Sequence, residues 1–470
     1  MNVFLATIPG SVTAPRGFFA AGVFCDIKRL GTGKGSNKGL KRDLGLIVSR
    51  VSAVAAGMFT TNQVCAAPVK VSLEHLRAGK ARAMVANSGN ANACTGLKGL
   101  RDAQAMAAMA ARQLRNAAFD HAARQVRSAP ETGLINPREI LVASTGRIGV
   151  LLPMLQVEKG IEAACASLDP SRESAGHFAE AILTSDTRPK EIAVEFSLGG
   201  KRVRIGGVCK GAGMIQPGMS PTGKRPAAVP LHATMLAFIT TDASIAAPAL
   251  KCALREAVAK SFNRITVDGD MSTNDSVFIL ANGLAGNPTV LLPARSADRS
   301  RGIRTEFGRF QAALEYVTLE LAKMIVRDGE GISRFVTVRV RGARTAREAE
   351  AAARAVANSA LVKTSWSGGD PNWGRIIDAL GYSSARVVEE TVDIGYARAG
   401  RRKTIYSLRG GQPTRVPFRS LCRIVAAEEF DLHIDLNLGP GEALIYAADL
   451  TEEYVEFNKG DVSDPSAMGG

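Results

Sequence analysis

Two kinds of segment recur along this chain, and their order limits the folds open to it. Short runs rich in β-branched residues predict strands at residues 44–48, 83–86, 194–197, 203–205, 277–280, 335–340, 432–436 and 443–446. Alanine-rich stretches with helical spacing predict helices at residues 102–117, 118–127, 250–262, 310–327 and 345–360. The strands come in groups without a strict strand–helix–strand rhythm. This order favours an α/β (α+β) chain of layered sheets covered by helices over one doubly wound parallel sheet.

Length and residue types set the class of protein. With 470 residues, 46% of them hydrophobic, the chain can bury a large core in two or three domains or layers. No stretch approaches the roughly 18 uncharged apolar residues that a membrane span needs, so we expect a soluble protein. The seven cysteines are scattered and never spaced C-x-x-C, which indicates neither a disulfide framework nor a zinc site. We therefore expect a reducing compartment and no bound metal.

A formal net charge of +15 raises the question of a nucleic-acid partner. The basic residues are spread along the chain, aromatic residues make up only 5%, and no reader motif is present. We expect no nucleic-acid binding, and the charge serves either to attract anionic substrates or to keep the protein soluble. Residues 1–25 contain no acidic side chain and include Arg16, which is compatible with an organellar transit peptide. Both the cytoplasm and a mitochondrial matrix remain open.

Three glycine-rich stretches resemble phosphate loops without satisfying the pattern. Residues 218–224 have the phosphate-loop spacing, but Arg225 stands where a serine or threonine should hold magnesium. Residues 31–39 form a basic loop, and residues 211–213 are too short for a dinucleotide fingerprint. The sequence does not support nucleotide binding or a bound cofactor.

The dipeptide Ala233-Thr234 carries the most specific chemical hypothesis. A threonine after a small residue can attack the preceding carbonyl, break its own peptide bond and emerge with a free α-amino group beside its hydroxyl. One residue would then supply a nucleophile and its base. Taken alone, a threonine in an apolar run is a strand residue.

Eight segments, one of which contains this dipeptide, give it its context. They lie at residues 12–18, 87–96, 144–149, 210–215, 233–243, 268–275, 328–331 and 370–375. Together they resemble the ornithine acetyltransferase family of arginine biosynthesis, also called the bifunctional glutamate N-acetyltransferase family. The matches run in family order from residue 12 to residue 463 and so cover nearly the whole chain.

The resemblance implies a fold and a maturation step. The fold is a helix–sheet–sheet–helix sandwich similar to N-terminal nucleophile enzymes, with a smaller C-terminal α/β region. Self-cleavage between Ala233 and Thr234 is implied, giving an α chain of residues 1–233 and a β chain of residues 234–470. Two copies of each chain would form a heterotetramer.

The resemblance also implies a reaction. An acetyl group moves from N2-acetyl-L-ornithine to L-glutamate through an acetyl-Thr234 intermediate, by ping-pong catalysis without a bound cofactor. Some family members also use acetyl-CoA as the donor, and the sequence leaves open whether this chain does.

The site residues carried over from the family fall into two groups. Thr145 and Gly146 would form the oxyanion hole, although residues 144–146 alone read as a polar strand-to-turn junction. Lys210 would pair with an anionic group, and Glu330 would recognise the ammonium of ornithine or position the reacting amine. The residues expected to bind substrate are Thr184, Lys210, Thr234, Glu330, Asn458 and Ser463.

The chain departs from the family pattern beside the predicted cleavage point. Thirteen residues, 220–232, separate Met219 from Ala233 where family members run on more directly. Self-cleavage depends on strain and close placement of the carbonyl, so this insertion either forms a surface loop or hinders the cut. Two other readings therefore stay open. One is a related N-terminal nucleophile amidohydrolase or aminopeptidase, and the other is an uncleaved binding protein on the same scaffold.

Overall fold

The computed structural model describes residues 5–28, 41–116, 135–224, 235–293 and 305–459. Within these ranges, no helix combines the length and the apolar character needed to cross a bilayer. All seven cysteines lie in the described part of the chain, and their thiols are free.

The larger of two sheets has ten strands, and its main path runs in the order β1-β6-β7-β9-β11-β3-β4-β5, with β2 and β8 also paired to β3. Its strands are β1 (Ala6–Thr7), β2 (Phe18–Val23), β3 (Leu44–Thr60), β4 (Lys80–Asn90), β5 (Ile140–Arg147), β6 (Lys190–Leu198), β7 (Lys201–Lys210), β8 (Met219–Ser220), β9 (Leu236–Thr241) and β11 (Ser276–Ala281). β6 and β7 form a hairpin around Gly199 and Gly200, both with positive φ as such tight turns require.

β3 is far longer than the five-residue strand predicted from the sequence. Its first part pairs with β2 and β4, whereas its last part pairs with β11. The added residues include the stretch Ser52-Ala53-Val54-Ala55-Ala56-Gly57, whose small side chains have little intrinsic preference for a strand. Pairing on both sides overrides that preference, and β3 joins the two halves of the sheet.

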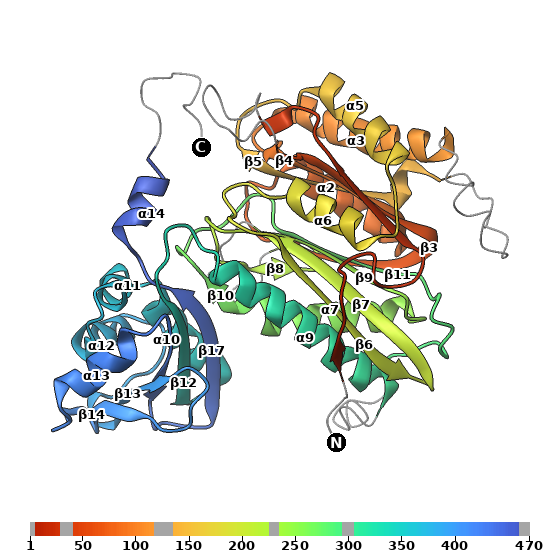
Figure 1. The fold of residues 1–470 in the computed structure, drawn as a ribbon. Helices are drawn as coiled ribbons and strands as arrows, with labels where there is room; N and C mark the ends of the chain where they lie inside the picture. The colour runs from red at the N-terminus through yellow and green to blue at the C-terminus, as the bar shows by residue number, and fades with distance from the viewer. Residues whose placement is uncertain (1–4, 29–40, 117–134, 225–234, 294–304, 460–470) are drawn as a thin grey trace.

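Alternating side chains sort the larger region into layers. Along β9, Leu236 and Phe238 join a central cluster, while Ala237 and Ile239 pack in a second cluster with helices α7 (Ala247–Lys260) and α9 (Glu306–Val326). Along β4, Met84 joins the same central cluster. Helices α3 (Gly96–Asn116) and α5 (Met154–Ala166) cover the other face of the sheet at β3, β4 and β5, as Figure 1 shows. The expected layered α/β fold is confirmed.

The remaining helices of the larger region are α2 (Ala67–His75) and α6 (Arg172–Ala181), which contribute to the central cluster, with short 3₁₀ turns η2 (Leu76–Ala78), η3 (Pro137–Glu139) and η4 (Phe262–Arg264). Four of the five predicted helices are present as α3, α7, α9 and α10 (Ala346–Asn358). The fifth prediction, at residues 118–127, lies outside the described residues.

The C-terminal region is built on a second, seven-stranded sheet in the order β10-β17-β12-β16-β13-β14-β15. Its strands are β10 (Ile265–Thr266), β12 (Phe335–Ala343), β13 (Asp393–Arg398), β14 (Ile405–Arg409), β15 (Gln412–Pro413), β16 (Glu429–Asp435) and β17 (Gly441–Ala448). One face packs against helices α10, α11 (Ala360–Ser367), α12 (Trp373–Gly381) and α13 (Phe418–Val425). The elements η6 (Glu389–Thr391) and α14 (Glu452–Phe457) complete it.

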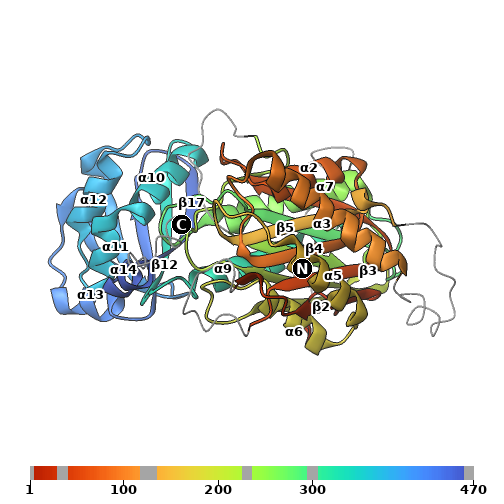
Figure 2. The same cartoon turned by 90° about the horizontal axis from the view of Figure 1, so that it is seen from above.

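Helix α9 lies between the two regions. Near its C-terminal end, Lys323 lies over the ring of Tyr446 and Arg327 over the ring of Phe335, both on the second sheet. Arg327 also forms an ion pair with Glu429 at 2.6 Å. Figure 2 shows the C-terminal region beside the larger one, with α9 between them.

Candidate active site

Three strand ends of the larger sheet meet at one edge. β7 runs antiparallel to β9, so its last residue, Lys210, pairs with the first residue of β9, Leu236. β11 runs parallel to β9, and its first residue, Ser276, also pairs with Leu236. In the sequence, Thr234 and Met235 come directly before β9. Lys210 and the residue before β11, Asp275, therefore flank the start of β9.

Lys210 is the charged centre of this edge. Its side chain is buried, with 2% of the residue exposed, and its Nζ donates to Thr184 Oγ1 at 2.7 Å and to Thr145 Oγ1 at 3.3 Å. Burial lowers the pKa of Lys210, while the nearby carboxylate of Asp186 opposes this shift. The structure thus brings three of the predicted site residues together.

The direction of these hydrogen bonds matters for catalysis. A lysine ammonium can only donate, so the hydroxyl oxygens of Thr145 and Thr184 act as acceptors toward it. Each threonine keeps its own O–H hydrogen free to donate elsewhere. Lys210 therefore leaves Thr145 able to donate a hydrogen bond to a substrate oxygen.

A buried cluster of ion pairs, formed by Asp186, Lys190 and Asp328, contacts Lys210. Asp186 accepts hydrogen bonds from the Gly211 N–H at 2.6 Å and from Lys190 Nζ at 2.7 Å, and its Oδ2 lies 3.7 Å from Lys210 Nζ. Lys190 also pairs with Asp328. Burial acts to raise the pKa of Asp186, but Lys210, Lys190 and the Gly211 N–H outweigh it and hold that pKa below its ordinary value. Asp186 is therefore a carboxylate that compensates two buried cations.

Asp275 contacts the start of β9 directly. One carboxyl oxygen accepts a hydrogen bond from the backbone N–H of Met235, and the other has no hydrogen-bond partner among the described residues. Burial raises the pKa of Asp275 well above its ordinary value, against the opposing effects of the Met235 N–H and Lys210. This favours a neutral carboxylic acid that contacts Met235, the residue that follows Thr234 in the sequence.

The predicted oxyanion residues lie at the end of β5. Thr145 is buried and Gly146 is exposed. Gly146 has a backbone φ of +128°, a value that residues other than glycine rarely adopt. A Cβ at Gly146 would lie 2.4 Å from the backbone carbon of Gly89 on β4, so only glycine fits. Asn274 ties this strand end to the loop before β11 by donating to the Ser144 carbonyl at 2.8 Å.

Glu330 and Asn458 form a second polar pair beside this edge. Asn458 Nδ2 donates to Glu330 Oε2 at 3.0 Å, and the Glu330 N–H donates to the Ala212 carbonyl at 3.0 Å. A Cβ at Gly213 would lie 2.3 Å from the Glu330 carboxylate, so glycine is needed where this carboxylate approaches. The segment from Lys210 to Gly213 therefore links the cation and the carboxylate of the site.

Some predicted residues lie elsewhere or beyond what the structure describes. Ala233, Thr234 and Ser463 lie outside the described residues, as does most of the insertion. Ser220, the first inserted residue, belongs to β8 and pairs with Phe59 of β3. Of the 370–375 motif, Asn372 caps α12 by accepting from the Arg375 N–H, so this motif serves the C-terminal region instead.

The sequence reasoning gave no role to Asp186, Lys190, Asp275 or Asp328. Asp275 and Asp328 stand in segments that the resemblance had singled out, but only the sheet pairing shows what they contact. Asp186 follows Thr184 by two residues in Thr-Ser-Asp-Thr, and its own side chain accepts the Thr184 N–H at 3.0 Å. A carboxylate next to a predicted binding residue was the available signal.

The site can bind an anion and stabilise a developing negative charge. It offers one buried ammonium, two hydroxyl donors and an exposed backbone turn at Gly146. Within the described ranges, no group of three or more histidine, cysteine, aspartate or glutamate side chains is placed to hold a metal ion. The side chains gathered here suit acyl transfer through an oxyanion.

Comparison with known proteins identifies relatives along nearly the full chain. A family model described as the ArgJ family matches residues 21–460. The arginine biosynthesis bifunctional protein ArgJ of Symbiobacterium thermophilum is 44% identical over 96% of this chain and 98% of its own length. The glutamate N-acetyltransferase of Methanocaldococcus jannaschii is 42% identical over 97% and 99%. The solved ornithine acetyltransferase of Mycobacterium tuberculosis, complexed with ornithine, is 33% identical over 46% of this chain and all of its own, with a TM-score of 0.38.

Proposed function

The chain belongs to the ArgJ family and is a glutamate N-acetyltransferase of arginine biosynthesis, and on that premise we propose that it moves the acetyl group of N2-acetyl-L-ornithine to L-glutamate through Thr234. The observation that carries this proposal is the meeting of Lys210, Thr145 and Thr184 beside the first residue of β9. Thr234 precedes that residue by two positions.

In the first half of the reaction, Thr234 Oγ attacks the acetyl carbonyl while its α-amine takes the hydroxyl proton. A C–O bond forms, and the carbonyl oxygen becomes an oxyanion. The N–C bond to ornithine then breaks, and the proton passes to the departing amine. An acetyl ester on Thr234 and free ornithine result.

Thr145 and Gly146 stabilise the oxyanion in each half-reaction. Lys210 donates to Thr145 Oγ1, so the Thr145 O–H hydrogen remains available to donate to the substrate. The buried ammonium adds positive charge close to that hydroxyl. A donor of this kind contributes about 3 kcal/mol to transition-state stabilisation.

In the second half, the amine of glutamate attacks the acetyl ester. The C–N bond of N-acetylglutamate forms, the bond to Thr234 Oγ breaks, and that oxygen recovers a proton from the attacking amine through the α-amine. Glu330, supported by Asn458, binds the ammonium of ornithine or orients the reacting amine. Thr184 and Lys210 bind an anionic group of the substrate, and Ser463 adds a contact.

Self-cleavage at Ala233-Thr234 is part of this proposal. The predicted α chain contains β3 and β7, and the predicted β chain contains β9 and β11. β7 pairs with β9, and β3 pairs with β11. Two chains cut at this bond stay joined through those strand ladders. We propose that two such pairs assemble as a heterotetramer, for which sedimentation analysis of the mature protein is the test.

Acetyl-CoA is proposed as a second donor, supported by the bifunctional ArgJ relative. Comparing acetylornithine with acetyl-CoA, each with glutamate as acceptor, tests this point separately. A cytoplasmic address is favoured over a mitochondrial matrix because the relatives compared above are bacterial and archaeal.

The central experiment joins mass with activity. Intact-mass analysis of the purified protein should show two chains, one of which begins Thr234-Met235-Leu236, together with glutamate-dependent acetyl transfer. Thr234→Ala should give one uncleaved, inactive chain, whereas Thr234→Ser keeps a hydroxyl and should retain part of both activities.

Other outcomes would point to the other readings. Transfer retained in Thr234→Ala would remove Thr234 from the mechanism. Release of acetate independent of glutamate would indicate a hydrolase, since water would then resolve the ester. A single inactive chain from the wild type would identify the 220–232 insertion as an obstacle to cleavage.

A further inference from the structure

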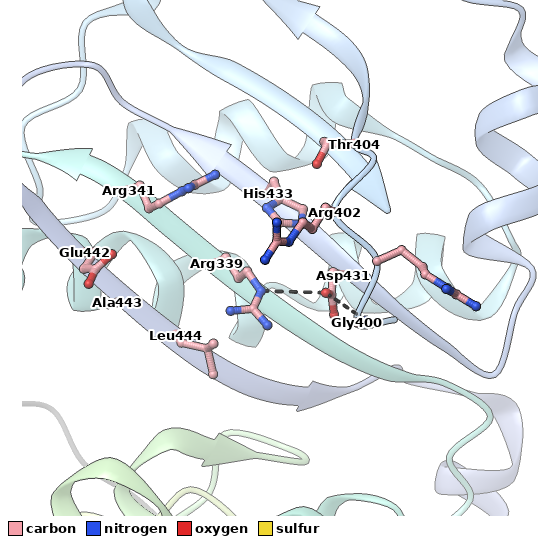
Figure 3. A pocket seen from close by; sticks show the side chains of 11 residues that line it. Arg339, Arg341, Gly400, Arg402, Thr404, Asp431, His433, Glu442, Ala443 and Leu444 are labelled. Carbon is pink, nitrogen blue, oxygen red and sulfur yellow. Dashed lines mark hydrogen bonds and ion pairs between the residues drawn. The ribbon is translucent and has the colours of Figure 1, made fainter. Parts of the chain in front are cut away.

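A pocket lies on the second sheet, on the face opposite helices α10 to α13. On β12, the side chains of Val336, Val338 and Val340 point into the helix-covered core, so Arg339 and Arg341 point to the other face. The end of α9 covers part of that face around Phe335 and Tyr446. Beyond α9, a pocket of about 600 Å³ remains, shown in Figure 3.

Positive charge is in excess around this pocket. Its lining includes two carboxylates, Asp431 and Glu442. It also includes four arginines: Arg339, Arg341, Arg401 and Arg402. Arg339 lies 3.7 Å from Asp431, which also accepts a hydrogen bond from the Gly400 N–H at 3.3 Å. Asp431 is thus already engaged. Arg341 and Arg402 have no side-chain hydrogen bond or ion pair with the described residues.

His433 adds an unused polar group to the same pocket. It is the direct neighbour of Arg339 in the parallel pairing of β12 with β16, and neither ring nitrogen has a hydrogen-bond partner among the described residues. Burial lowers the pKa of His433 against the opposing charge of Asp431, and the charges of Arg339 and Arg341 add to the lowering. The neutral ring offers one N–H donor. Figure 3 shows His433 with Arg339 and Arg402 over the same strands.

The arrangement of these groups indicates what they bind. Guanidinium groups contact phosphate oxygens with two parallel hydrogen bonds, and Arg339 and Arg341 are separated by about 7 Å along one face of a strand. Arg402 approaches from the turn between β13 and β14. Three such groups exceed what one carboxylate can satisfy, whereas they match an anion with several charged oxygens. The volume suits a small organic ligand, for which pockets span roughly 300–1,000 Å³.

We propose that this pocket is a second ligand site, separate from the acetyl-transfer centre, that binds a compact polyanion of the diphosphate class, either free or as part of a nucleotide. No glycine-rich loop takes part, which explains why no nucleotide motif marks it in the sequence. The groups come from β12, β16 and the β13–β14 turn, and Arg341 and Arg401 are 60 positions apart in the sequence (401 minus 341). The proposal is independent of the acetyl-transfer mechanism.

The test is calorimetric titration of the full-length mature protein with inorganic pyrophosphate at low ionic strength. ADP, orthophosphate and uncharged adenosine serve as parallel probes. We expect pyrophosphate to bind at least about tenfold more tightly than orthophosphate, because it engages two guanidinium groups instead of one. ADP binding more tightly than pyrophosphate would indicate that the natural ligand is a nucleotide. Equal affinity for ADP and pyrophosphate would indicate a free diphosphate. Either result supports the site.

Variants locate the binding. Arg341→Gln and Arg402→Gln should each weaken pyrophosphate binding by about tenfold or more. Arg419→Gln, an exposed arginine of α13 outside the pocket, is the matched control and should leave binding unchanged. Thermal unfolding midpoints check that each variant is folded.

Three results would overturn the proposal. The first is wild-type protein that binds pyrophosphate no better than adenosine. The second is equal weakening by Arg419→Gln, which would indicate a diffuse charge effect. The third is a changed sedimentation coefficient in Arg341→Gln and Arg402→Gln with unchanged pyrophosphate binding, which would make this face a contact between copies of the protein.

Discussion

The carboxyl group of Asp275 accepts a hydrogen bond from the backbone N–H of Met235, the residue that follows Thr234. The contact crosses from the start of β11 to the start of β9, two parallel neighbours in the larger sheet. Asp275 is fully buried, and its second oxygen has no hydrogen-bond partner in the described part of the chain. This buried acid therefore fixes the backbone beside the predicted nucleophile.

Asp275 predicts a pH dependence of stability. Its folded-state pKa is raised, so the folded protein keeps a proton that the unfolded chain releases above a pKa of about 3.9. The stability contributed by protonated Asp275 is complete below that value and falls as the pH rises. Asp275→Asn keeps an oxygen for the Met235 N–H but cannot ionise. We expect this variant to gain stability relative to its parent as the pH rises from about 4 to 7.

The measurement is urea unfolding across that pH range, with both proteins in the Thr234→Ala background so that the chain stays intact. Asp270→Asn removes an exposed carboxylate of the same segment and serves as the control. A stability difference between Asp275→Asn and its parent that stays constant with pH would contradict a raised pKa.

The Thr145 hydroxyl predicts a specific loss of rate. Thr145→Val keeps the shape of the side chain but removes the donor, so kcat for acetyl transfer should fall by about 10²–10³-fold. Thr145→Ser keeps the hydroxyl and should retain most of the rate. Steady-state kinetics with acetylornithine and glutamate check both, and equal activity in the valine and serine variants would exclude Thr145 as an oxyanion donor.

The ion cluster behind Lys210 predicts a large loss of stability. Lys190→Met leaves Asp186 and Asp328 without their shared buried cation, which should cost about 3–5 kcal/mol of unfolding free energy. Arg188 pairs with the same Asp328 at 3.8 Å, but 61% of its side chain is exposed. Arg188→Gln should therefore cost only about 0–1 kcal/mol. Urea unfolding measures both, and similar costs would show that Lys190 is not the main partner.

Glu330 predicts a change in substrate affinity. Glu330→Gln can still accept from Asn458 but loses the charge for an ammonium group, so KM for acetylornithine should rise by about tenfold. The fall in kcat should be smaller if Glu330 binds the ground state and the transition state equally. Glu453→Gln removes an exposed carboxylate of α14 nearby and is the control. An unchanged KM in Glu330→Gln would place the ammonium elsewhere.

The strands and helices were largely predictable, with instructive exceptions. β12 and α9 follow from hydrophobic patterns that act over a few neighbouring residues. β3 was predicted only as far as residue 48, because the small residues beyond it are held in the sheet by β11, which lies more than two hundred residues later in the chain. Long-range pairing overrides local preference there.

Some residues of the site were predictable from the sequence, and others were not. The resemblance singled out Thr145, Thr184, Lys210, Glu330 and Asn458. Hydrogen bonds join Lys210 to Thr145 and Thr184, and Asn458 to Glu330. Thr234 stays a prediction because it lies outside the described residues. Asp186 and Lys190 could not be assigned from the sequence, because an acidic or basic residue in isolation is more often a solvated surface group.

The sequence by itself determined the types of segment, the family and the chemical groups available, because these depend on residue identity and short spacing. Only the tertiary structure decided which charges are paired and which are left over. Asp186 and Lys190 are buried together with Asp328 because a charge removed from water needs a partner, and folding brings that partner from another part of the chain. Arg341 and Arg402 meet at one pocket because β12 and the β13–β14 turn share a sheet face, and no local pattern records that excess of charge.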